Sequence, residues 1–103
     1  MKTTVIIGRI ASIGKLIRRA SGNDVAEIIV YNTIHTRWET EHKQYHRVIV
    51  SGAQGQTALS CLEKGDLICA EGNLCNIDHL MTLSCTHLCF LNKKRRALHS
   101  EEV

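Results

Sequence analysis

Apolar residues alternate with polar ones in several short runs, a pattern typical of β-strands whose two sides face different environments. Residues 5–10 form a β-branched run interrupted by Gly8, where the missing side chain permits a sharp bend. A dense turn signal at residues 21–24 separates this run from a second long apolar strand over residues 25–33. We expect these two strands to pair as a hairpin.

The pattern changes twice after the second strand. Residues 34–44 are predicted to form a polar loop, and a third strand centred on residues 48–50 ends at Ser51 and Gly52. Over residues 53–62 the apolar spacing becomes helical, and Gly65 supplies a stop signal soon after. We therefore expect one short helix there.

Two further strands follow the helix. Residues 67–76 return to a period of two, and residues 76–79 make a short polar break before a last strand over residues 80–91. The residues of the fourth strand predicted to face the core are Ile68, Ala70, Gly72 and Leu74. The apolar residues Leu83, Leu88 and Phe90 do not share one parity, so we predict a bulge in the last strand.

The resulting element order favours an all-β fold: a five-stranded Greek-key barrel of the OB type, with one short helix between strands 3 and 4. The length of 103 residues and the 44% hydrophobic content suit one domain, which we assign to residues 1–92. Residues 93–103 form a basic and then acidic tail, which we expect to be flexible. A domain of this size buries a modest fraction of its surface, which favours a homo-oligomer.

Charge and cysteine content narrow the class of protein. The formal net charge of +3 is too small for a protein that wraps duplex DNA by charge alone, so local clusters must decide. The five cysteines are an odd number and follow no signal peptide, which predicts a reducing cytoplasm. No run approaches the roughly 18 apolar residues of a membrane span, so we expect no membrane association.

Metal and catalytic chemistry find little support. Cys85, His87 and Cys89 alternate along the last strand and would share one side of a regular strand, but the close Cys-x-x-Cys turns of structural zinc sites are missing. Small buried hydrophobes are the favoured interpretation of the cysteines. His46 is expected to be packed or at a subunit contact. No nucleophile, base and oxyanion donor converge, so we expect no enzyme, no metal and no cofactor.

The candidate binding residues gather before the third strand. Trp38, the one tryptophan, lies in the predicted polar loop, and Tyr45 precedes the apolar strand. Such rings can stack on unpaired bases while cations neutralise phosphates, which is how single strands are gripped without reading sequence. The cations beside the rings are Arg37, Lys43 and Arg47, and a second tier of phosphate contacts comprises Lys2, Lys15, Arg18 and Arg19. Single-stranded DNA is the predicted ligand, with RNA as an alternative.

From about residue 4 to residue 91 the chain resembles the bacterial single-stranded DNA-binding protein family. The resemblance implies a barrel that binds single strands in DNA replication, recombination or repair and assembles as a homotetramer. In the related branch of primosomal replication protein N, also called primosomal protein B, it implies a homodimer. The matching segments are Val5-Ile6-Ile7-Gly8-Arg9-Ile10, Ser21-Gly22 with Val25-Ala26, His46-Arg47-Val48-Ile49-Val50 with Gly52, Leu62-Glu63-Lys64-Gly65-Asp66 and Glu71-Gly72-Asn73-Leu74.

The resemblance also ranks the candidate rings. Tyr45 falls where the family has a base-stacking tryptophan, whereas Trp38 lies about two residues beyond the place of the family's other tryptophan. Ser51 replaces a family aromatic residue, which implies weaker binding than that of a standard member. The alternative is a primosomal-type dimer, or a protein-interaction module with weak DNA binding, that serves replication restart. Either protein is expected in the cytoplasm at the nucleoid, with replication or primosome proteins as further partners.

Overall fold

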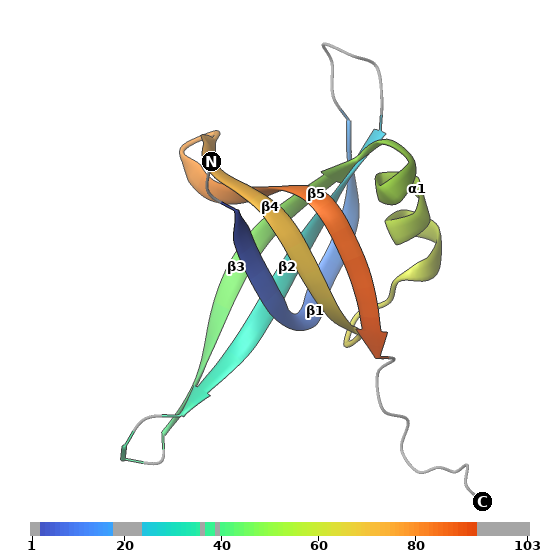
Figure 1. Cartoon of the computed structure of the whole chain (residues 1–103). Coiled ribbons are helices and arrows are strands. Elements are labelled where there is room, and N and C mark those ends of the chain that lie inside the picture. Colours follow the sequence, from blue (N-terminus) through green and yellow to red (C-terminus); the bar gives the residue numbers. More distant parts are fainter. Residues whose placement is uncertain (1–2, 18–23, 36, 39, 93–103) are drawn as a thin grey trace, which may run out of the picture.

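The computed structural model describes residues 3–17, 24–35, 37–38 and 40–92, and within them the predicted order of elements is confirmed. Figure 1 shows the strands wrapping around a common axis, with the helix against one side. The elements are β1 (Thr4–Ile17), β2 (Asp24–His35), β3 (Glu41–Ser51), α1 (Gly52–Cys61), β4 (Leu67–Ile77) and β5 (Leu80–Asn92). The predicted tail at residues 93–103 lies outside the described residues.

The strands close into a barrel in the order β1-β2-β3-β5-β4, with β4 pairing back to β1. The β3–β5 pairing is parallel and the others are antiparallel. Strand β1 serves two neighbours: its first half pairs with β4 and its second half with β2, with a register shift between Ile10 and Ser12. A Cβ atom at Gly8 would collide with the carbonyl oxygen of Tyr31, so the close approach of β1 to β2 needs glycine there. The predicted five-stranded Greek-key barrel is confirmed.

The core lies inside the barrel and follows the alternation of the strands. Burying each of its larger aliphatic side chains contributes about 1.5–3 kcal/mol to folding. Helix α1 packs on β2 and β3 and adds Ala58 to the core, with Leu59 and Leu62 half-buried beside it. The buried members of the cluster are Ile6, Ile10, Ala26, Ile28, Val30, Val48, Val50, Ala58, Ile68, Ala70 and Leu83.

The β4–β5 hairpin confirms one prediction and corrects another. Between Glu71 and Gly72 the register shifts so that Thr86 is the extra residue of β5, which is the predicted bulge. Leu74 was expected in the core, but 51% of it is exposed. In the described residues the pairing of β1 with β4 ends at Gly72, two residues before Leu74, so β1 does not cover the Leu74 side chain there.

The predicted polar loop at residues 34–44 is mostly strand, so that prediction is wrong. The pairing of β2 with β3 continues from Tyr31 opposite Tyr45 to His35 opposite Glu41. We call residues 31–45 the arm, and Figure 1 shows the ends of β2 and β3 projecting from the barrel. Its side chains are mostly polar because both faces of the paired strands meet solvent. A strand pair of this composition has the same sequence pattern as a polar loop.

The one helix of the described residues, α1, is ten residues long, and no described helix is long and apolar enough to cross a membrane.

Candidate nucleic-acid interface

A row of side chains crosses the outer face of the barrel at the base of the arm. Arg9 of β1 lies opposite Tyr31 of β2, and Tyr31 lies opposite Tyr45 of β3. Directly paired residues of antiparallel strands project from the same face of a sheet. Val30 beside Tyr31 points into the core, so the row of Arg9, Tyr31 and Tyr45 faces outward.

The two tyrosines of this row form one aromatic surface. Their ring centroids are 6.1 Å apart, and their planes are tilted by 51°. Lys43 reaches back over the Tyr31 ring, with Nζ 4.6 Å from the ring centroid, which is a cation–π contact. Tyr45 is 58% exposed, so its ring is open to a ligand. This arrangement places a positive charge directly beside a stacking surface.

Sequence reasoning missed Tyr31 and Arg9. Tyr31 was treated as part of an apolar strand, although the alternation that buries Ile28 and Val30 already turns residue 31 outward. Arg9 lay in the run at residues 5–10, and its Nη1 donates to the carbonyl oxygen of Gly65 at 2.9 Å. Parity along β2 would have found Tyr31, but only the β1–β2 register places Arg9 beside it.

Trp38 and Arg37 lie at the tip of the arm. Trp38 is 79% exposed, and Arg37 is also exposed. Glu41, the first residue of β3, is four residues from Tyr45, or about 13 Å along an extended strand. Trp38 and the tyrosine pair are therefore separate aromatic surfaces along the arm.

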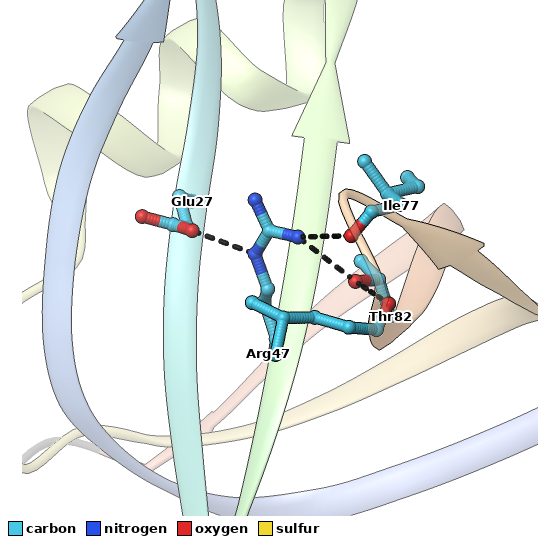
Figure 2. Close-up of polar contacts among 5 residues, drawn as sticks. Glu27, Arg47, Ile77 and Thr82 are labelled. Atoms are coloured by element: carbon cyan, nitrogen blue, oxygen red, sulfur yellow. Dashed lines mark hydrogen bonds and ion pairs between the residues drawn. The ribbon is translucent and has the colours of Figure 1, made fainter.

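Arg47 differs from the other predicted cations. Its side chain is 11% exposed, and its Nε donates to Oε2 of Glu27 at 2.7 Å. Its Nη1 donates to the carbonyl oxygen of Ile77 at 3.2 Å and to Oγ1 of Thr82 at 3.1 Å (Figure 2). We expected Arg47 to meet phosphates, and the structure places its guanidinium among partners of its own chain.

Lys15, the one described residue of the second tier of predicted cations, is not brought to the arm. Lys15 lies on β1 opposite Ala26, near the start of β2, whereas the arm is at the end of β2. Lys15 is exposed, and five residues of extended strand separate its partner Ala26 from Tyr31, about 16 Å. Lys2, Arg18 and Arg19 lie outside the described residues.

Two grooves flank the tyrosine pair. The groove on the β1 side, which we call the Arg9 groove, has a volume of about 300 Å³, and the groove on the β5 side, the Leu80 groove, has about 330 Å³. The Arg9 groove is lined by Ile7, Gly8, Arg9, Tyr31, Asn32, Thr33 and Leu67. The Leu80 groove is lined by Glu27, Ile29, Tyr45, His46, Arg47, Leu80 and Met81. Together they extend the aromatic surface into a track across the outer face.

The expectation that the cysteines are small buried hydrophobes is wrong, because Cys61 is exposed and the other four are only half-buried. The bulge at Thr86 turns Cys85 toward the core, while His87 stays on the outer face opposite Glu71. Cys85 and His87 therefore do not lie on the same side of β5, as a regular strand would have placed them. Burial raises the pKa of the Cys85 thiol. None of the five cysteines forms a disulfide, and the described residues contain no group of three or more metal-ligating side chains. His46 is packed at the barrel end, with Nε2 2.7 Å from Oδ1 of Asn32.

A closed five-stranded barrel with one helix between β3 and β4, and with exposed rings and cations on its outer face, defines the OB-fold class. The model of the single-strand binding protein family matches residues 1–79, and the chain belongs to this family.

Solved structures with the same fold include two single-stranded DNA-binding proteins and the protein priB. The mitochondrial single-stranded DNA-binding protein Rim1 of S. cerevisiae has a TM-score of 0.73 at 18% identity, over 90% of this chain and 96% of that one. The small single-stranded DNA-binding protein of Streptomyces coelicolor has 0.72 at 15% identity, over 86% and 90%. The protein priB of Ralstonia solanacearum has 0.68 at 10% identity, over 88% and 99%. No curated protein sequence matches the chain.

Proposed function

We propose that this protein binds single-stranded DNA, with little sequence preference, by base stacking and phosphate neutralisation. One observation carries the proposal: the Tyr31–Tyr45 pair, with the Tyr45 ring exposed and the Lys43 cation over the half-buried Tyr31 ring, lies between two grooves in a member of the single-strand binding protein family. Aromatic platforms beside cations bind unpaired bases of any identity, because every base has a π-face. The same surface accommodates RNA.

The residues divide into roles along the strand. Tyr45 and Tyr31 stack with bases at the base of the arm, while Trp38 stacks with a different nucleotide at its tip. Lys43 and Arg37 neutralise phosphates beside these rings. Lys2, Lys15, Arg18 and Arg19 continue the phosphate contacts beyond the arm. Binding of this kind makes and breaks no covalent bond, so the protein acts as a non-enzymatic DNA-binding component of replication, recombination or repair, in the cytoplasm at the nucleoid.

A homo-oligomer fits the surface of the first half of β1. Val5 and Ile7 are each about half exposed, and they lie next to Glu71 and Cys69 of β4 on the outer face. Pairing this apolar strip with a second copy would remove it from water. Several barrels on one strand would also multiply weak individual sites through effective concentration. Light scattering distinguishes a monomer, a dimer and a tetramer.

The decisive experiment is a titration of the full chain with oligothymidine, followed by the fluorescence of Trp38 at two salt concentrations. Stacking on Trp38 should quench the emission, and the affinity should fall as salt rises because phosphate contacts release counterions. Absence of both a quench and salt-sensitive binding would overturn the proposal. That outcome would favour the protein-interaction module of replication restart.

A further inference from the structure

The Leu80 groove has a wall that no binding role yet explains. In the parallel pairing of β3 with β5, Arg47 lies beside Thr82. Two residues earlier on each strand are Tyr45 and Leu80, which therefore project from the same face as Arg47 and Thr82. Both line the groove, together with Met81, and Leu80 and Met81 are each more than half exposed. One aromatic and two apolar residues thus line one open groove.

Arg47 holds this wall from both sides of the β4–β5 turn. Its Nη1 donates to the carbonyl oxygen of Ile77, the last residue of β4, and to Oγ1 of Thr82 in β5. The Thr82 hydroxyl in turn donates to the carbonyl oxygen of Leu80 at 3.0 Å. Figure 2 shows the guanidinium lying between Glu27 on one side and Ile77 and Thr82 on the other. A single planar side chain therefore ties β2, β3 and the turn together.

The turn between β4 and β5 is short and has a defined backbone conformation. Ile77 lies opposite Leu80, so the connection consists of Asp78 and His79, with φ angles of 54° and 66°. Two successive residues in the left-handed region form the tight hairpin turn whose twist matches the flanking strands. The position of Leu80 is consequently set by the turn on one side and by the Arg47 contacts on the other.

The charge in the groove is balanced. Glu27 lines the groove, and an unpaired carboxylate there would repel a polyanion. Its Oε2 accepts from Arg47 at 2.7 Å, so the pair presents no net charge beside the apolar wall. The occupant favoured by such a slot is flat, largely apolar on its faces and attached to a backbone that can stay outside, which describes an unstacked nucleobase.

We propose that the Leu80 groove is a slot for one unstacked base of the bound single strand, between the Tyr45 ring and the side chains of Leu80 and Met81. Arg47 is the positioning residue of this slot and not a phosphate contact. The inference rests on the proposed function, since it names a further subsite and the residue that builds it.

Direct evidence for the slot comes from Leu80→Ser and Met81→Ser, with Leu91→Ser as a matched control. Leu91 is a comparably exposed apolar residue of β5 at its other end. Each slot variant should lose about tenfold in affinity for oligothymidine, within the range for one stacked base, at an unchanged salt slope. Leu91→Ser should bind as the wild type does. In a Tyr45→Ala background the loss caused by Leu80→Ser should largely disappear, because the two residues hold the same base.

The role of Arg47 is tested by comparing Arg47→Lys with Arg47→Gln. Lysine keeps the charge but lacks the planar fork that reaches Glu27, Ile77 and Thr82 together, so a positioning role predicts that both variants lose affinity equally at an unchanged salt slope. A phosphate contact predicts instead that lysine binds normally and that glutamine lowers the salt slope by about 0.7.

The two proposals fail differently. A wild-type protein without salt-sensitive binding overturns the proposed function. A wild-type protein that binds, with Leu80→Ser and Met81→Ser equal to Leu91→Ser, overturns the slot alone. Full binding by Arg47→Lys overturns the positioning role. Because the serine changes are at exposed side chains, they test the slot even where the Arg47 variants unfold.

Discussion

The paired strands β2 and β3 pass through two environments, the barrel and the arm. In the barrel, Ala26, Ile28 and Val30 are buried together with Val48 and Val50 of the partner strand. In the arm the same ladder continues without a register shift, yet every residue from Tyr31 to His35 and from Glu41 to Tyr45 is half-buried or exposed. Identical backbone pairing thus supports two different uses of side chains.

The comparison separates stability from binding. A side chain in the barrel is surrounded by the core and contributes through burial, so its loss leaves a cavity. A side chain in the arm has water on one side and can exchange that water for a ligand. Substitutions in the barrel should therefore change the free energy of unfolding, and substitutions in the arm should change DNA affinity.

The largest expected effect is on stability, from the matched pair Ile28→Ala and Ile34→Ala. Both residues lie on β2 with the same parity, but Ile28 is fully buried in the barrel while Ile34 is exposed in the arm. Ile28→Ala should lower the free energy of unfolding by about 2–5 kcal/mol, and Ile34→Ala by less than about 0.5 kcal/mol. Urea unfolding followed by circular dichroism measures both. Equal losses in the two variants would contradict the division between barrel and arm.

The next effect is on affinity, from Tyr45→Ala and Tyr31→Ala. Each should weaken binding of oligothymidine by about 1–3 kcal/mol, because a stacking platform is lost. Phenylalanine at either position keeps the ring and should retain most of the affinity. Fluorescence anisotropy of a labelled oligonucleotide measures the affinity, and urea unfolding of the same variants should show little change. Wild-type affinity in both alanine variants would refute the aromatic surface.

A smaller effect is expected for Lys43→Gln, which removes a charge from the arm and leaves the barrel intact. If Lys43 meets one phosphate, the slope of log affinity against log salt should become shallower by about 0.7. Lys64→Gln is the comparison variant, because it removes the same charge from the connection between α1 and β4, outside the arm. Parallel salt titrations of the two variants measure the slopes, and an unchanged slope for Lys43→Gln would remove Lys43 from the phosphate track.

The smallest effect concerns a thiol of the barrel. Burial raises the pKa of the Cys85 thiol above its ordinary value of 9.0, so Cys85 stays neutral to a higher pH, whereas Cys61 is exposed to reagent. Iodoacetamide should therefore label Cys61 before Cys85 at pH 8–9, as measured by mass spectrometry over time.

The same shift gives a dependence of stability on pH. Above the ordinary thiol pKa the unfolded chain loses the Cys85 proton while the folded chain keeps it, so stability falls as pH rises toward the higher folded value. Cys85→Ser should reduce this alkaline loss. In the iodoacetamide experiment, faster labelling of Cys85 than of Cys61 would contradict the burial of Cys85.

Local pattern predicted most of the fold. Turn signals, the helical spacing before Gly65 and the conflicting parity of Leu83 and Leu88 led to the right order of elements and to the bulge. The arm escaped prediction because its residues are polar on both faces, so the usual contrast between a buried and an exposed side is absent. Leu74 was wrongly predicted to lie in the core. An alternation of period two predicts which face of the sheet a residue occupies, but it does not predict where the neighbouring strand ends.

The candidate site was predicted only in part. The exposure of Trp38 and Tyr45 could be predicted because aromatic residues among polar neighbours are visible in a sequence. The separation of Trp38 from Tyr45 along the arm could not be predicted from the sequence. Paired extended strands hold residues farther apart than an irregular loop with the same number of residues does. Arg47 was assigned by its charge, whereas its low exposure and its partners depend on strands 20 to 35 residues away along the chain.

The sequence by itself determined the order of the elements along the chain, the single helix, the core of alternating aliphatic residues and the presence of exposed rings near the third strand, because each depends on spacing within one segment. The tertiary structure alone decided that Arg9, Tyr31 and Tyr45 form one row, that Arg47 is held by Glu27, Ile77 and Thr82, and that Leu80 and Tyr45 line one groove. Those relations depend on the registers between strands distant in the chain. A shift of one residue in any register would move a side chain to the opposite face.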